Sequence, residues 1–128
     1  MTATTLIDAS CAELEPPVID EDHLARMTLG DLNLEREVLE IFARQTALML
    51  GRIANTSPAL AAAAAHTLTG SARGIGAWRV AQAAERLEYV ASRAGGQGLG
   101  QAIEALTAAA AEANATIAAR LAAGSRDP

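Results

Sequence analysis

Apolar residues recur at helical intervals along almost the whole chain, and this periodicity constrains the fold more than any other feature. From Leu34 to Ile53 the apolar positions follow a helical period, and the same kind of spacing returns over 80–91 and 103–121. No segment shows the alternation of apolar and polar residues that is typical of a strand. The chain is therefore predicted to be all-α.

Residues that start or stop helices divide this pattern into one short helix and four long ones. The breaks occur at Asp20, Gly30, Asp31, Ser57, Pro58, Gly74, Gly76, Gly95, Gly96 and Gly98. The first helix follows Asp20, and a long second helix starts near Leu34. The last three helices are predicted from Ser57 to about Gly74 or Gly76, from about Ala77 to Ala94, and from about Leu99 to Ala122.

Brief connections between four long helices favour an antiparallel up-and-down four-helix bundle, with the short additional N-terminal helix covering one end. A length of 128 residues matches one domain. The bundle domain is predicted over residues 18–123, between a flexible N-terminal tail at 1–17 and a C-terminal tail at 124–128. Because aromatic residues make up only 2% of the chain, its core is predicted to consist mostly of alanine and aliphatic side chains.

Composition argues against several classes of partner and location. The net charge is -5, and the ten basic residues form no run that could follow a nucleic-acid backbone, so nucleic acid is not expected as a partner. Residues 53–72 carry no charged side chain, but they contain several polar residues and Pro58, so no membrane span is expected. A single cysteine, Cys11, permits no intramolecular disulfide, and no signal peptide is recognisable. A cytoplasmic location is expected.

His66 is the candidate functional residue. Successive residues of a helix turn by about 100°, which places Ala62, Ala63 and Gly70 within roughly 60° of the His66 direction. Bulky residues such as Leu68 point the opposite way, so His66 is predicted to face water from an open surface of small residues. Glycine inside a helix costs about 1 kcal/mol relative to alanine, which suggests that Gly70 keeps space clear beside the imidazole. The alternative is a histidine without chemistry.

The segment from Ala65 to Ala77 resembles the signature of histidine-containing phosphotransfer (HPt) domains. That signature reads His, any residue, Leu, Lys, Gly, Ser, Ala, with a further glycine and alanine one turn later. The matching residues, in order and spacing, are His66, Leu68, Gly70, Ser71, Ala72, Gly76 and Ala77. In helix layout the resemblance extends over roughly Val18 to Leu121.

The resemblance implies a carrier in a two-component phosphorelay. His66 would accept a phosphoryl group from an aspartyl phosphate on the receiver domain of a hybrid sensor kinase and pass it to the receiver domain of a response regulator. A neutral imidazole nitrogen near physiological pH is a suitable nucleophile. No cofactor is expected in this chain, and Mg²⁺ is expected on the partner receiver domain. The chain has no lysine and so cannot contain a nucleotide-binding Gly-Lys loop; it is not an ATP-dependent kinase by itself. A monomer is expected, although bundles can also pair.

The sequence departs from the family pattern at Thr69, where the usual residue is lysine. Arg73 lies two turns after His66 in nearly the same direction, and its guanidinium group is a candidate replacement for the missing charge. The alternative is a solvated helix residue. In the family, a glutamine or glutamate near the position of Glu88 can contact the imidazole. A carboxylate there would accept the Nδ1 proton and leave Nε2 as the nucleophile, unless it is merely exposed.

Two other functions compete with the relay carrier. A non-catalytic helical adaptor would bind receiver domains without efficient transfer, and Thr69 is the observation in its favour. A metal-dependent bundle enzyme would need glutamates and histidines on several facing helices, an arrangement that the two histidines lack. In both receiver-binding cases, the docking face is expected to include Leu24, Met27, Ala62, Ala63 and Gly70.

Overall fold

A computed structural model describes residues 17–93 and 97–125 and confirms an all-α fold. The helices of the described residues are α2 (Glu21–Met27), α3 (Leu32–Ala54), α4 (Pro58–Ile75), α5 (Trp78–Arg93) and α6 (Leu99–Ser125). No strand occurs among these residues. Residues 1–16 of the predicted N-terminal tail, with Cys11, and residues 126–128 of the predicted C-terminal tail lie outside the described residues, as do residues 94–96.

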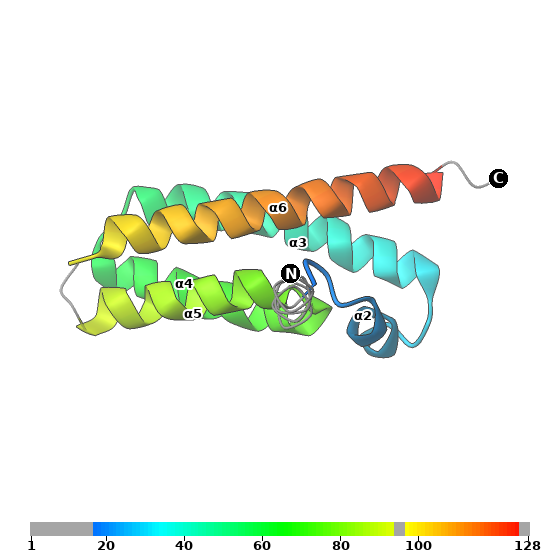
Figure 1. The fold of residues 1–128 in the computed structure, drawn as a ribbon, viewed down its shortest axis with the longest axis horizontal. Coiled ribbons are helices and arrows are strands. Elements are labelled where there is room, and N and C mark those ends of the chain that lie inside the picture. Colours follow the sequence, from blue (N-terminus) through cyan, green and yellow to red (C-terminus); the bar gives the residue numbers. More distant parts are fainter. Residues whose placement is uncertain (1–16, 94–96, 126–128) are drawn as a thin grey trace, which may run out of the picture.

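The four long helices form an antiparallel bundle, and α2 lies at the end of the bundle where α3 begins (Figure 1). Each long helix packs against two others, in the cyclic order α3, α4, α5 and α6, while α2 packs against α4. Arg120 on α6 forms ion pairs with Glu21 on α2 and the buried Glu35 on α3, which connects α6 to the first two helices. The predicted architecture, a four-helix bundle with a short additional N-terminal helix, is therefore confirmed.

Side-chain caps set the starts of the first three described helices. A carboxylate oxygen of Asp20 accepts the backbone N–H of His23 at 3.1 Å, and Asp31 accepts that of Leu34 at 3.0 Å. Because Asp31 is the cap, α3 begins at Leu32 rather than near Leu34. Ser57 caps α4 as predicted, and Pro58 occupies its first turn.

The core is built from aliphatic residues and many alanines. Leucines at the centre of every helix are fully buried, as are several alanines of α4, α5 and α6. The fully buried leucines are Leu24, Leu68, Leu87 and Leu106, with Leu39 exposed by only 1%. None of the helices in the described part of the chain is both long and apolar enough to span a membrane.

A tight corner fixes α2 to the C-terminal end of α4. Gly76 ends α4 with a φ of +80°, and its carbonyl accepts the backbone N–H of Asp20 at 2.9 Å. The indole of Trp78 donates to the Asp20 carboxylate at 2.9 Å and lies 4.9 Å from the His23 ring, whose Nε2 is 2.9 Å from the Arg73 carbonyl. The hydrogen bond from Trp78, with that from the His23 backbone, lowers the pKa of Asp20.

The last helix is longer than the sequence pattern predicts. Its helical backbone continues to Ser125, whereas the prediction ended it near Ala122 and placed the domain boundary at residue 123. The sequence from 118 to 123 is rich in alanine, the residue with the highest helix propensity, so no local signal stops the helix at 122.

Candidate functional site

His66 lies in the middle of α4 with its ring in solvent. Its side chain is 75% exposed, while Ala65 and Leu68 beside it in the sequence are fully buried against the core. Gly70, one turn further along, is exposed, and a Cβ atom built there would have nothing within 4 Å. The imidazole therefore stands on an open face of the helix, with free space on the side of Gly70.

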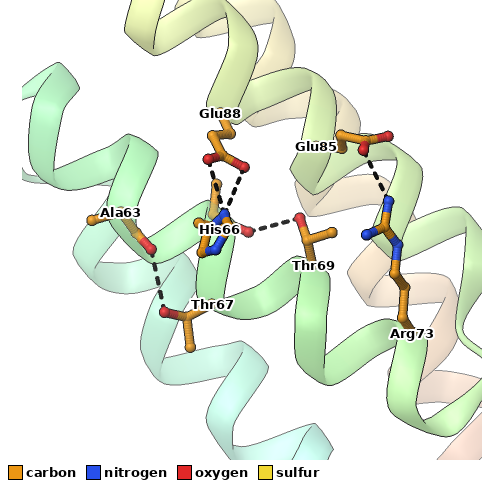
Figure 2. A network of polar contacts seen from close by, with 8 residues as sticks. Ala63, His66, Thr67, Thr69, Arg73, Glu85 and Glu88 are labelled. Atoms are coloured by element: carbon orange, nitrogen blue, oxygen red, sulfur yellow. Dashed lines mark hydrogen bonds and ion pairs between the residues drawn. The ribbon is translucent and has the colours of Figure 1, made fainter.

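Glu88 on α5 contacts one nitrogen of this ring. Its carboxylate oxygens lie 3.0 and 3.2 Å from Nδ1 of His66 (Figure 2). An ionised carboxylate can only accept hydrogen bonds, so Nδ1 carries the proton in this contact and the lone pair of a neutral ring resides on Nε2. Among the described residues, none forms a hydrogen bond with Nε2. The ring is thus oriented with its nucleophilic nitrogen available.

Thr69 does not reach the imidazole. Its side chain is only 5% exposed, and its hydroxyl donates to the Ala65 carbonyl at 2.9 Å. The side chain is therefore turned away from solvent, towards the backbone of its own helix. The threonine that replaces the family's lysine satisfies its own hydroxyl within α4 and adds no charge to the site.

Arg73 is engaged with a different acid from the one that holds His66. Its Nη2 lies 2.9 Å from Oε2 of Glu85, and both side chains are more than half exposed. The His66–Glu88 contact and the Arg73–Glu85 ion pair lie side by side between α4 and α5 (Figure 2). The structure thus brings His66 together with Glu88, whereas Arg73 is not in contact with the imidazole.

Comparison with known families identifies the chain. A family model described as Hpt domain matches residues 33–119, which is more than half of the sequence and includes His66. The chain belongs to the Hpt-domain family. Histidine phosphotransfer is accordingly the general function of this Hpt domain. Among proteins with curated descriptions, none shows significant similarity to it.

A solved structure supports the fold independently. The X-ray structure of a rice protein described as a candidate histidine-containing phosphotransfer protein aligns with a TM-score of 0.68. The alignment covers 89% of this chain and 86% of the rice chain at 18% sequence identity. At that identity the similarity concerns the fold alone, and it extends well beyond the residues around His66.

The residues predicted for partner docking are not all on the surface. Met27, Ala63 and Gly70 are exposed and Ala62 is half-buried. Leu24 is completely buried, so it adds no area to the exposed face, and its part in docking stays a prediction. It lies on the inner side of α2, where the short helix packs onto the bundle core.

An apolar groove beside His66 was missed by the sequence analysis. It lies between α3 and α4, has a volume of about 720 Å³, and includes Ala63 and Thr67, which flank His66 in the sequence. Two of its leucines, Leu48 and Leu60, are 67% and 62% exposed. The helical period of apolar residues from Leu34 to Ile53 includes Leu48 and by itself predicts a core position for it. A signal was present, because Leu48 follows the half-exposed Ile41 by seven residues, and such a spacing forms a second stripe beside the core.

The described residues include no group of three or more histidine, cysteine or acidic side chains that could hold a metal ion. The site therefore consists of an exposed imidazole, its carboxylate partner, a neighbouring ion pair and an apolar groove.

Proposed function

We propose that this Hpt domain carries a phosphoryl group between the aspartates of two receiver domains through phospho-His66. The observation that supports this most directly is the pairing of His66 with Glu88. It leaves Nε2 unbonded on a side chain that is 75% exposed. A carrier needs one nucleophilic atom that two successive partners can reach, and Nε2 meets that requirement.

The transfer step needs little from the carrier. The Nε2 lone pair attacks the phosphorus of an aspartyl phosphate, the bond from phosphorus to the aspartate oxygen breaks, and its electron pair leaves with the carboxylate. Nδ1 keeps its proton, so the phosphorylated ring gains a positive charge that the Glu88 carboxylate, 3.0 Å away, stabilises. Attack by a second aspartate carboxylate on the same phosphorus reverses these changes and releases neutral His66.

Most of the charge neutralisation in such a step is expected from the partner. Phosphoryl transfer depends mainly on positioning and on electrostatic stabilisation of the phosphoryl oxygens. We place Mg²⁺ in the acidic pocket of the receiver domain for this purpose. Within the carrier, Glu88 orients the imidazole for this step.

The receiver domain is proposed to cover the groove between α3 and α4. A protein that brings an aspartyl phosphate to Nε2 must also cover the surface around His66, and that surface continues through Ala63 and Thr67 into the groove. The exposed Leu48 and Leu60 offer apolar area to such a partner. Gly70 lets the partner's backbone approach the ring closely. We propose a monomer in the cytoplasm as the working form.

The experiment is a transfer assay with matched histidine variants. The chain is incubated with receiver domains that a small-molecule phosphodonor has phosphorylated, and protein-bound phosphate is measured after acid and after base treatment. The proposal predicts an acid-labile, base-stable label that His66→Gln abolishes. His23→Gln is the control, because His23 is the other histidine and lies in the corner between α2 and α4.

The assay also tests the adaptor hypothesis, which the uncharged Thr69 favours. An adaptor would bind receiver domains in a pull-down or titration while wild-type protein gained no label. A label of equal size in wild type and His66→Gln would place the phosphoryl group elsewhere and contradict the assignment of His66.

A further inference from the structure

We infer that Arg73 binds the phosphoryl group once it is on His66. While His66 is unmodified, Arg73 pairs with Glu85 instead. The inference rests on the proposed function, because it concerns the state in which His66 is phosphorylated. It assigns Glu85 and Arg73 a part in the site, although neither contacts the imidazole in the unmodified protein.

The contact of His66 with Glu88 and the ion pair of Arg73 with Glu85 are neighbours between α4 and α5. Glu85 and Glu88 are three residues apart on α5, which corresponds to a rise of about 4.5 Å along the helix. Glu88 contacts Nδ1 of His66 at 3.0 Å, and Glu85 contacts Nη2 of Arg73 at 2.9 Å. Arg73 follows His66 by two turns of α4, and its side chain extends towards α5, where the guanidinium lies beside Glu85 while the imidazole lies beside Glu88 (Figure 2).

A phosphoryl group at Nε2 would need a cation at this position. The acids nearest to His66 on α5 are Glu85 and Glu88, and both would repel the phosphoryl oxygens. Arg73 is the only basic residue in the sequence of α4, apart from His66 itself. Arg73 also forms an ion pair with Glu85, one of these two acids.

The arginines of α5 are not placed to do this. Arg79 donates to Glu112 on α6 at 3.0 Å, and Arg93 stacks over the Tyr89 ring at 5.1 Å from its centroid. Arg86 lies two residues before Glu88, roughly 200° around the helix, and so projects away from His66. Among the arginines of α4 and α5, Arg73 is therefore the one whose ion pair lies next to the His66–Glu88 contact.

Exchange of Arg73 between its two partners requires only side-chain rotation. The pair with Glu85 is open to water, with exposures of 55% and 61%, and exposed ion pairs of this kind are held weakly. A phosphoryl group presents more oxygens and more negative charge than a carboxylate, and a guanidinium can bind two of those oxygens at once. Phosphorylation of His66 should thus draw Arg73 away from Glu85.

The test measures the phosphoryl group directly, with no receiver domain present. The full chain is labelled with phosphoramidate: Nε2 attacks phosphorus, the bond from phosphorus to the amine nitrogen breaks, and ammonia leaves. Phosphorus-31 NMR then follows the last protonation of phospho-His66 as a function of pH. A neighbouring cation favours the dianion, so Arg73→Ala should lower the acid dissociation constant of the phosphoryl group roughly fivefold.

Three further variants separate this explanation from a structural role. Arg79→Ala removes an arginine from a comparable ion pair on another side of α5 and should leave the dissociation constant unchanged. Glu85→Gln should raise the constant in the wild-type background, because it frees Arg73 and removes a negative charge. In the Arg73→Ala background only the charge effect remains, so the same substitution should have a smaller effect.

The outcomes are distinct. An Arg73→Ala protein with the wild-type constant would refute phosphoryl binding by Arg73. Equal effects of Glu85→Gln with and without Arg73 would refute the exchange between Glu85 and the phosphoryl group. A wild-type protein that takes no label at His66 would contradict the proposed function, and this inference with it.

Discussion

Gly70→Ala should make this protein more stable and, at the same time, a poorer phosphoryl carrier. Gly70 lies inside α4, well away from either end, where glycine costs about 1 kcal/mol relative to alanine. A Cβ atom at this position would meet nothing within 4 Å, so no clash offsets the gain in helix propensity. We expect the free energy of unfolding to rise by about 0.5–1 kcal/mol.

The same substitution should slow phosphoryl transfer from a receiver domain to His66. The new methyl group would stand one turn from His66, on the exposed surface that a receiver domain must approach. A small displacement of a reacting group costs a large factor in rate, so transfer from a phosphorylated receiver should slow by roughly tenfold or more. Labelling by phosphoramidate should change little, because that donor is small enough to avoid the methyl group.

Urea unfolding followed by circular dichroism measures the first effect, and a time course of label on His66 measures the second. Gly100→Ala is the matched control: Gly100 is exposed in α6, has open space around its Cβ position, and belongs to a helix that does not line the site. It should leave transfer unchanged. The reasoning fails if Gly70→Ala destabilises the protein or transfers phosphate from the receiver at the wild-type rate.

Three other substitutions test the frame that positions the site. Gly76→Ala should lower the free energy of unfolding by about 2 kcal/mol in urea titrations, because Gly76 has a positive φ and an added Cβ would lie 2.9 Å from the Cβ of Asp20. Leu68→Ala, at a fully buried position directly behind His66, should cost about 2–5 kcal/mol in the same assay. The lowered pKa of Asp20 means that its carboxylate stabilises the fold fully above the usual aspartate range, and that this contribution is lost as pH falls below about 4. The stability difference between wild type and Asp20→Asn should therefore shrink from pH 7 to pH 3, and a constant difference would argue against the Trp78 hydrogen bond as its source.

The helices could be predicted from sequence because their signals are local. Asp20, Asp31 and Ser57 accept backbone N–H groups at helix starts, and Gly76 adopts the left-handed conformation at a helix end. These are properties of a few neighbouring residues, so their positions follow from residue type alone. The extension of α6 to Ser125 shows the limit, since alanine favours a helix without specifying where it ends.

The site was only partly predictable because it depends on which face of each helix meets its neighbour. The exposure of His66 followed from the small residues around it, and Glu88 could be placed at its level by assuming an antiparallel return of α5. The burial of Leu24 and Thr69 depends on how α2 and α5 lie against α4, which helical periodicity does not specify. The pairing of Arg73 with Glu85 depends on the rotamers of both side chains, so it could not be predicted from the sequence.

The residues that sequence rules explain least well lie close to His66. Gly70 weakens the interior of a helix, and Leu48 and Leu60 expose apolar area in the groove that continues from Ala63 and Thr67. Each lowers stability or solubility without benefit to the isolated bundle, and such local conflicts are expected where a surface has a function. Because they share one face with an imidazole whose Nε2 is unbonded, one partner that covers this face would account for all three. Replacing Leu48 or Leu60 by serine should therefore slow transfer from a receiver domain and leave phosphoramidate labelling unchanged, and an equal effect on both donors would argue against docking in the groove.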